Sequence, residues 1–385
     1  RAKIKEQCGA CPNFMSQKVH QPFPVHNVMR LHARIDGALD RTMRNHPLQA
    51  ACNNGLRPLY EDLNEFVARK GKRIRPLLFI LTHQLFNPRP ARNDDLIQAA
   101  LALELFHAFI LVHDDVIDRS DSRRGRPTLH KMVEERLVQF KDRARTGINV
   151  SIVMGDLLFA MACEKLVTSG FDSACKEKAL AAFIQYVTDT GRGEMYDILH
   201  TARDIDRVKP KDIHRTYFLK TTKYSFECPM VIGAILGGAS ARQIRDLIKF
   251  ARPIGLAFQI RNDLMEFERA EDAGKSLIDD LFEGKKTLLI RTAYDRLGKI
   301  DKLFLQTCFD AKRIKSDAVE RIRHLVIKSG AFSKLSKQVE SLFRDANRIL
   351  ENSSLDAGQK TGLSKVLTFL KRTTLSASPS SRASS

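Results

Sequence analysis

Aspartate and arginine residues gather in one short stretch, HDDVIDRSDSRRGRPTLH, which covers residues 113–130. Asp114 and Asp118 are four residues apart, so on a helix both carboxylates lie on the same face. Two such carboxylates repel each other and need cations, and a purely oxygen ligand set suits a hard ion such as magnesium. The guanidinium groups of Arg123 and Arg124 follow directly and match phosphate oxygens. The stretch therefore predicts a site for a metal ion and a diphosphate.

Four further polar clusters occur along the chain, each beside an apolar helical stretch. They are GKRIRP (71–76), YFLKTTKYSFE (217–227), FQIRNDLMEF (258–267) and GKSLIDDLFEGKKTLL (274–289). Each cluster alone would more readily be a solvated helix face, and the aspartates of the first stretch could simply cap a helix end. Five clusters in this order favour a single site instead.

Helices are the elements that must position these clusters. Apolar residues step along the chain by three or four positions in two long stripes. These stripes are Leu96, Ala100, Leu103, His107, Ile110 and Asp114, and then Leu247, Phe250, Ile254, Phe258, Arg261 and Met265. Clean strand alternation and internal repeats are hard to find. We therefore predict an all-α protein with one helical domain over residues 28–372. An N-terminal arm (1–27) precedes it, and a disordered Ser/Thr-rich tail (373–385) follows it.

The composition excludes several classes of protein. Hydrophobic residues make up 43% of the 385 positions, and Gly and Pro are too few for a fibrous or mainly disordered chain. The longest apolar run, residues 96–112, is slightly short for a membrane span, so we expect no transmembrane segment. The absence of a signal segment and the scattered cysteines predict a reduced, cytoplasmic setting. Cys8 and Cys11 lack a second pair at matching spacing and are interpreted as incidental.

A net charge of +19 predicts anionic partners: nucleic acid, a phospholipid surface or phosphorylated small molecules. The basic residues are spread along the whole chain, and most of the 22 Phe residues lie within apolar periodic runs. The interleaved aromatic and basic residues that form a stacking platform for nucleic acid are absent. We therefore expect no nucleic-acid partner.

The order and wording of these segments resemble the trans-prenyl diphosphate synthases, the farnesyl and geranylgeranyl diphosphate synthase family, over about residues 30–350. The resemblance implies an isoprenoid synthase helical bundle around a central cavity, usually as a homodimer. It also implies head-to-tail condensation of an allylic diphosphate with isopentenyl diphosphate, with magnesium or, alternatively, manganese as cofactor. No protein nucleophile is expected, because the departing diphosphate accepts the proton.

The resemblance also implies a role for each matching residue. The metal ligands would be Asp114, Asp118, Asn262, Asp263 and Glu266, with Asp115 in support. The allylic diphosphate would be held by Arg123, Lys220, Lys275 and Lys285, beside the polar residues Thr221 and Gln259. Isopentenyl diphosphate would be held by Lys72, Arg75, His107 and Arg124. In GEMYD (193–197), Glu194 replaces the glutamine of the family motif, and Asp197 would lie near the metals.

The second acidic motif departs from the family pattern, because Asn262 replaces its first aspartate. A neutral amide oxygen attracts a cation less than a carboxylate does, so we expect one metal ion to bind more weakly. An Asn-Asp opening also occurs in class I terpene synthases, which are an alternative on the same fold. Their motif needs Ser or Thr four residues later and Glu eight later, where this chain has Glu266 and Ala270. A weakly active partner subunit is a further alternative, but it would be expected to lose the first motif or the RRG.

Product length is predicted from the residues four and five positions before the first aspartate, which are Ile110 and Phe109. By the resemblance, bulk at these places stops the growing chain, and Phe106 lies a turn further on. The first motif lacks the two-residue insertion of many bacterial farnesyl synthases, so we predict a C20 product, with C15 next. Phe109 could alternatively be ordinary core packing.

Overall fold

The computed structural model describes residues 25–46, 55–87, 93–123, 125–269, 284–310 and 316–375. The described chain is almost entirely helical, which confirms the all-α prediction. Its strands are β1 (Ser122–Arg123) and β2 (Arg126–Pro127), which form one short antiparallel pair. Cys8, Cys11, most of the arm and most of the tail lie outside the described residues, so the predicted division into arm, domain and tail stays a prediction.

The helices follow one another with short connections. The first nine elements are α1 (Val25–Asn45), α3 (Arg57–Ala68), α4 (Ile74–Phe86), α5 (Asn93–Ile117), α6 (Leu129–Arg136), α7 (Arg143–Val167), α8 (Ser173–Thr201), α9 (Pro210–Tyr217) and η1 (Phe218–Glu227). The remainder are α10 (Cys228–Leu236), α11 (Ala241–Arg269), α13 (Leu288–Arg296), α14 (Lys299–Asp310), α15 (Ser316–Lys328), α16 (Ala331–Glu351) and α17 (Ala357–Leu375).

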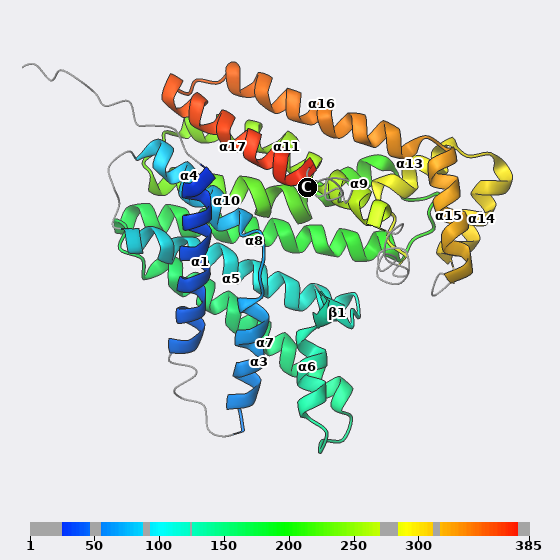
Figure 1. Ribbon diagram of the computed structural model, residues 1–385, viewed down its shortest axis with the longest axis horizontal. Helices are drawn as coiled ribbons and strands as arrows, with labels where there is room; N and C mark the ends of the chain where they lie inside the picture. Colours follow the sequence, from blue (N-terminus) through cyan, green and yellow to red (C-terminus); the bar gives the residue numbers. More distant parts are fainter. Residues whose placement is uncertain are drawn as a thin grey trace, which may run out of the picture.

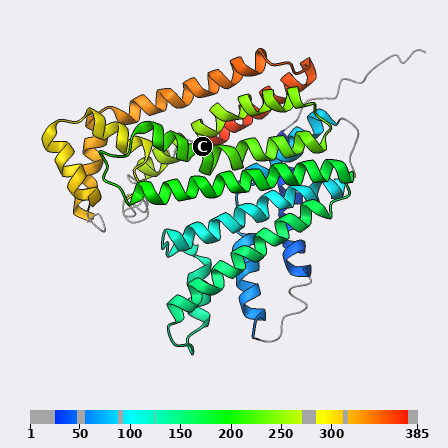
Figure 2. The ribbon, with the colours of Figure 1, turned by 180° about the vertical axis from the view of Figure 1, so that it is seen from behind.

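Two groups of buried side chains form the core. One packs α1, α3, α5, α6, α7 and α8 together, and the other packs α9, α11 and α13 to α17. Helices α4 and α10 contribute to both groups, so they join the two halves of the bundle. Figures 1 and 2 show α11, α16 and α17 on one side of α10 and α8, with α5 and α7 on the other.

Helix α5 is apolar around most of its circumference because it is packed on several sides. It contacts α7 most extensively and also α1, α4 and α6. Among the described helices, it is the one that is long and apolar enough to cross a membrane, but 67% of its most apolar window is buried inside the protein. Burial of this kind is typical of a core helix, and the apolar run ends at Asp114, Asp115 and Asp118.

The segment η1 is π-helical over ten residues, from Phe218 to Glu227. Sequence analysis treated this stretch as a short polar segment, whereas the structure buries Leu219, Thr222 and Tyr224 in it. π-Helical turns are rare and often occur at functional sites, because the wider turn reorients neighbouring side chains. Here the segment crosses between the two halves of the core and carries Lys220 and Thr221.

Candidate active site

The first acidic motif is held at the end of α5 by an arginine from β1. The Arg123 guanidinium lies 2.6 Å from Asp115 Oδ1 and 3.1 Å from Asp114 Oδ2. Gly125 takes a positive φ of 75° in the turn between β1 and β2, a conformation that favours glycine. The Thr128 hydroxyl donates to the carbonyl of Ser120 at 2.8 Å and closes the loop. The chain after α5 therefore folds back so that Arg123 meets the carboxylates.

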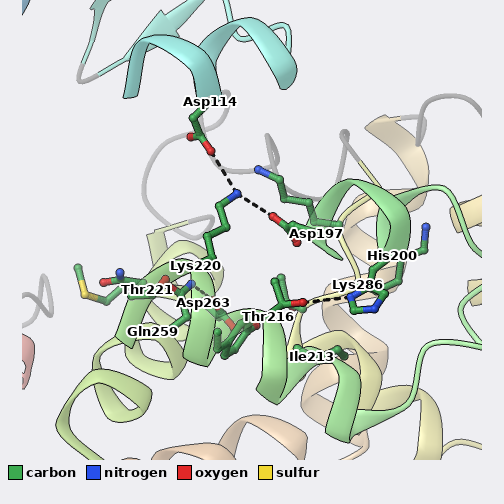
Figure 3. A pocket seen from close by; sticks show the side chains of 15 residues that line it. Asp114, Asp197, His200, Ile213, Thr216, Lys220, Thr221, Gln259, Asp263 and Lys286 are labelled. Atoms are coloured by element: carbon green, nitrogen blue, oxygen red, sulfur yellow. Dashed lines mark hydrogen bonds and ion pairs between the residues drawn. The ribbon is translucent and has the colours of Figure 1, made fainter. Parts of the chain in front are cut away.

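A lysine from η1 lies between three acidic side chains. Lys220 Nζ is 3.1 Å from Asp114, 2.9 Å from Glu194 and 2.8 Å from Asp197. Figure 3 shows this ammonium group between Asp114 of α5 and Asp197 of α8. A second lysine, Lys285, donates to Asp118 at 2.7 Å. The carboxylates predicted to bind metal are thus paired with lysines from distant parts of the chain.

These ion pairs change the pKa values of the carboxylates in different directions. Burial would raise the pKa of Asp114, but the charges of Lys220, Lys285 and Arg123 outweigh it and lower the pKa. Burial raises the pKa of Asp118, although Lys285 opposes the shift. Burial also raises the pKa of Asp115 to about 6, against the opposing charge of Arg123. The motif therefore combines a strongly ionised aspartate with two that are harder to ionise.

Gly193 of α8 allows η1 to approach closely at this point. A Cβ atom at position 193 would lie 2.5 Å from the backbone nitrogen of Lys220 and 2.8 Å from its Cα. Backbone atoms cannot yield as a flexible side chain can, so only glycine permits this contact. The glycine of the GEMYD motif therefore determines where the lysine lies relative to Glu194 and Asp197.

The second acidic motif is organised by a chain of hydrogen bonds. The Tyr217 hydroxyl donates to Asp263 Oδ2, and the Gln259 amide donates to Asp263 Oδ1 at 3.0 Å. Gln259 in turn accepts from the Thr221 hydroxyl at 2.8 Å. The backbone N–H of Leu288 donates to the Tyr217 oxygen at 2.9 Å. Burial and the charge of Asp263 raise the pKa of Tyr217, so the tyrosine stays protonated and donates to the carboxylate.

A cavity of about 270 Å³ joins the two acidic motifs. Its lining residues are Asp114, Asp197, His200, Ile213, Thr216, Tyr217, Lys220, Thr221, Gln259, Asn262, Asp263, Met265, Lys285, Lys286 and Thr287 (Figure 3). Polar atoms of both charge signs face the same small volume, with apolar surface from Ile213 and Met265. Such a cavity can accept a charged ligand together with a counter-ion.

The donor atoms of this cavity fit a hard divalent cation. Carboxylate and amide oxygens come from both motifs and from α8, without sulfur or imidazole nitrogen in the predicted ligand set. Asp115 Oδ2 is buried and has no hydrogen-bond partner, so one more carboxylate oxygen is available. Within the described part of the chain, no three acidic, histidine or cysteine side chains are already grouped around one metal position. Lys220 and Lys285 instead neutralise the carboxylates, so metal binding requires these ammonium groups to change partners.

The chain matches a known family over most of its length. The polyprenyl synthetase family model matches residues 57–326. The chain belongs to this family. A short chain isoprenyl diphosphate synthase of Methanothermobacter thermautotrophicus is 32% identical over 60% of this chain. A geranylgeranyl diphosphate synthase of Sulfolobus acidocaldarius is 31% identical, also over 60% of this chain. In both cases the match spans 66% of the relative, just under two thirds of its length.

A solved structure shares the fold of this polyprenyl synthetase. It is a geranylgeranyl pyrophosphate synthase from Corynebacterium glutamicum, complexed with isoprenyl diphosphate and magnesium. The TM-score is 0.81 at 25% identity, and the match covers 90% of this chain and 98% of that one. The similarity confirms the predicted isoprenoid synthase bundle and the resemblance drawn from the sequence motifs.

The polyprenyl synthetase brings together only part of the predicted basic pocket. Arg75 donates to the Tyr224 hydroxyl at 2.5 Å and to Ser225 Oγ at 2.8 Å. His107 Nδ1 lies 3.3 Å from the same tyrosine oxygen. Lys72 lies just before α4, three residues from Arg75. Arg124 and Lys275 lie outside the described residues, as does the side chain of Glu266.

Aromatic side chains close the space beside α5 on the N-terminal side of Asp114. The Phe109 ring lies 5.5 Å from Phe159 of α7 and 5.8 Å from Phe106. Phe183 of α8 packs against Phe106 at 5.1 Å. Phe109 is therefore one member of a four-ring cluster drawn from three helices. Ile110, its neighbour on α5, is only partly buried and packs against the same half of the core.

Several lining residues were not identified from the sequence. They are His200, Ile213, Thr216, Tyr217, Met265, Lys286 and Thr287. Thr216 and His200 form a hydrogen bond of 3.2 Å, and Lys286 donates to the carbonyl of Thr201 at 2.6 Å. Tyr217 and Lys286 stand beside residues that were selected, so proximity to Lys220 and Lys285 was the available signal. The others have no distinguishing pattern in the sequence.

Proposed function

We propose that this polyprenyl synthetase is a prenyltransferase that condenses an allylic diphosphate with isopentenyl diphosphate, head to tail, in the presence of magnesium. The observation that carries this proposal is the alternation of carboxylates and lysines around one cavity. Asp114, Asp118 and Asp197 meet Lys220 and Lys285 there. A metal–diphosphate complex needs both charge signs, because the carboxylates hold the metal and the ammonium groups hold the phosphates. The names of the relatives support the same reaction.

Residues of both acidic motifs would hold the metal. They are Asp114, Asp118, Asn262, Asp263 and, by its place in the sequence motif, Glu266. Magnesium, when bound, neutralises the diphosphate and stabilises the charge that develops as the carbon–oxygen bond ionises. Lys220 and Lys285 then exchange their carboxylate partners for diphosphate oxygens, and Arg123 does so with part of its fork. Because these cations are already at the cavity wall, they need little reorganisation when substrate arrives.

Isopentenyl diphosphate would bind on the side of Arg75 and His107. Tyr224 holds both side chains in place, and the Arg75 guanidinium also stacks over its ring at 4.4 Å from the centroid. Stacking and two hydrogen bonds fix the plane of the guanidinium, which suits a bidentate contact with a phosphate. Lys72 and Arg124 would complete this pocket.

The product is proposed to be geranylgeranyl diphosphate (C20), with the C15 diphosphate as the next alternative. The cluster of Phe106, Phe109, Phe159 and Phe183 would form the floor that stops chain growth. Ring-to-ring packing makes this floor stiff, because no single side chain can move without disturbing its neighbours. Relatives named as geranylgeranyl diphosphate synthases support the C20 assignment.

We also propose that the chain forms a homodimer through the adjoining helices α7 and α8, which lie on the face shown in Figure 2. Large apolar side chains are exposed on both helices: Ile152, Val153, Ile184, Met195, Ile198 and Leu199. Exposed apolar residues that recur on neighbouring helices are typical of a protein–protein interface. Met195→Glu with Ile198→Glu should yield a monomer by size-exclusion chromatography with light scattering. A cytoplasmic location stays a prediction.

The deciding experiment incubates the purified chain with isopentenyl diphosphate, magnesium and each of the C5, C10 and C15 allylic diphosphates. Mass spectrometry should detect a longer prenyl diphosphate that disappears when the metal is chelated. Asp114→Asn should abolish it, whereas Asp121→Asn, a substitution at an 83% exposed side chain in the same segment, should not. Release of a hydrocarbon or alcohol from the allylic substrate alone would instead assign a terpene synthase. Absence of all turnover would favour the partner-subunit alternative.

A further inference from the structure

The turn between α6 and α7 exposes two large apolar side chains at the end of the molecule. We call residues 136–145 the tip; Val138 is 67% exposed and Phe140 is 51% exposed. Figure 1 shows the tip projecting from the lower end of the bundle, beyond α6 and α7. Exposing a phenylalanine and a valine two residues apart in water is unfavourable, so a surface that covers them would be stabilising.

Cations surround these apolar side chains. Lys141, Arg143 and Arg145 are all exposed, and none of them has an acidic partner within 4.0 Å among the described residues. The carboxylate of Asp142 instead accepts from the backbone N–H of Arg145 at the start of α7. The N-terminus of that helix adds further positive potential. The tip therefore presents apolar and cationic groups together.

The tip is held rigidly, so it presents these groups in a fixed arrangement. Arg136 donates to both carboxylate oxygens of Asp62 on α3, the second of them at 2.8 Å. Leu137 is buried in the core, and the backbone N–H of Phe140 donates to its carbonyl at 2.9 Å. The bond to Asp62 also places the start of α3, where Leu56 is exposed, on the same side of the molecule. A small mixed surface is thus built at one end of the bundle.

We propose that this tip binds membranes that contain anionic phospholipids. Val138 and Phe140 would enter the interfacial layer, and Lys141, Arg143 and Arg145 would contact lipid phosphates. Apolar side chains flanked by unpaired cations match a lipid interface, which offers hydrocarbon and negative charge in adjacent layers. A nucleic acid would require aromatic side chains repeated among the cations, and the tip has only one. The net charge of +19, far more than one diphosphate site needs, adds long-range attraction to such a surface.

This inference goes beyond the proposed reaction and does not depend on it. The test is flotation of the full purified chain with vesicles of phosphatidylcholine alone and of phosphatidylcholine mixed with phosphatidylglycerol. The chain should float with the mixed vesicles only, and added salt should weaken the association. Val138→Ser with Phe140→Ser should weaken it at least about tenfold, because two inserted apolar side chains are lost. Lys141→Gln with Arg143→Gln and Arg145→Gln should remove the preference for phosphatidylglycerol.

A matched control removes two other exposed apolar side chains. Ile300 and Leu303 of α14 are 80% and 63% exposed, and Ile300→Ser with Leu303→Ser should leave flotation unchanged. Equal flotation of the tip variants and the unmodified chain would overturn the proposal, and so would a failure to float with mixed vesicles. Binding to soluble polyglutamate that survives Phe140→Ser and competes fully with vesicles would assign the tip to an acidic protein partner instead. Circular dichroism of each variant establishes that it is folded, and both substituted tip side chains are exposed enough to be tolerated.

Discussion

Replacing Tyr217 with phenylalanine is the most direct test of how the second acidic motif is organised. The hydroxyl of this buried residue makes two hydrogen bonds, one to Asp263 and one from the backbone N–H of Leu288. Leu288 begins α13, so its N–H is one of the groups that a helix leaves without an internal partner. Phenylalanine keeps the ring in the core and removes both bonds at once.

The stability cost follows from the two bonds. An orphaned buried N–H costs about 1–3 kcal/mol, and a hydrogen bond to a charged group is worth about 1.5–3 kcal/mol. The free energy of unfolding should therefore fall by at least about 2.5 kcal/mol. For a domain of about 300 residues, this corresponds to a decrease in Tm of roughly 4 °C. Asp263 keeps Gln259 as its remaining donor, so it should rotate rather than leave the cavity wall.

The effect on function should exceed the effect on stability. Removing a partner that orients a metal-binding side chain typically lowers metal affinity or activity by about 10-fold to 100-fold. Tyr217→Phe should therefore raise the magnesium concentration for half-maximal activity by at least about tenfold. The matched control is Tyr186→Phe, which also removes a hydrogen bond between a buried tyrosine and a carboxylate, that of Glu227, but away from the cavity. It should lower Tm without changing the magnesium dependence. Equal magnesium curves for the two variants would refute the positioning role of Tyr217.

Three further predictions concern charge, product length and metal affinity. Burial raises the pKa of Asp115 to about 6 from the model value of 3.8, so the folded state binds the extra proton between these values and the free energy of unfolding falls as pH rises through that range, by about 3 kcal/mol. Asp115→Asn should remove this fall, so the Tm of the variant relative to the unmodified chain should increase from pH 4 to pH 7 in thermal unfolding. Phe109→Ala should lengthen the product by an isoprene unit or more in mass spectrometry, and Phe109→Ala with Phe159→Ala should lengthen it further, because the Phe159 ring still blocks the space in the single variant. Asn262→Asp should lower the magnesium concentration for half-maximal activity several-fold, because a carboxylate replaces an amide oxygen at the cavity wall.

Each of these predictions has an outcome that would contradict it. Parallel Tm profiles for Asp115→Asn and the unmodified chain would show that the aspartate is not the group that titrates. An unchanged product from Phe109→Ala with Phe159→Ala would place the end of the prenyl chain elsewhere. A higher magnesium requirement in Asn262→Asp would mean that added repulsion with Asp263 outweighs the gain of a ligand.

The helical fold and the ends of the motif helices were predictable because both are local. Three-and-four spacing defined the stripe that ends at Asp114, and the structure places that residue at the end of α5. Lys220, Asp197 and Gln259 were selected from short motifs, and all three line the cavity. A motif is read within about ten residues, so agreement is best where the chemistry is encoded over that distance.

Interactions between distant segments were not predictable in the same way. The sequence indicated cations and carboxylates but not that Lys220 would lie between Glu194 and Asp197, because that depends on how closely α8 and η1 pack. The π-helical turn has no periodic signature of its own, so its buried residues were taken for a polar segment. Phe159 is one apolar residue among many on α7, and only tertiary packing places it against Phe109.

The separation in sequence of the site's charges has a consequence for how the protein folds. Asp118 and Lys285 are 167 residues apart, and their ion pair requires both halves of the core to be in place. Helix α5 can form early from local contacts, and at that stage Asp114, Asp115 and Asp118 repel one another without their lysines. Refolding should therefore recover helical circular dichroism before it recovers activity. The slow step is the docking that brings the lysines to the carboxylates, and added salt should accelerate it by screening the repulsion that precedes it.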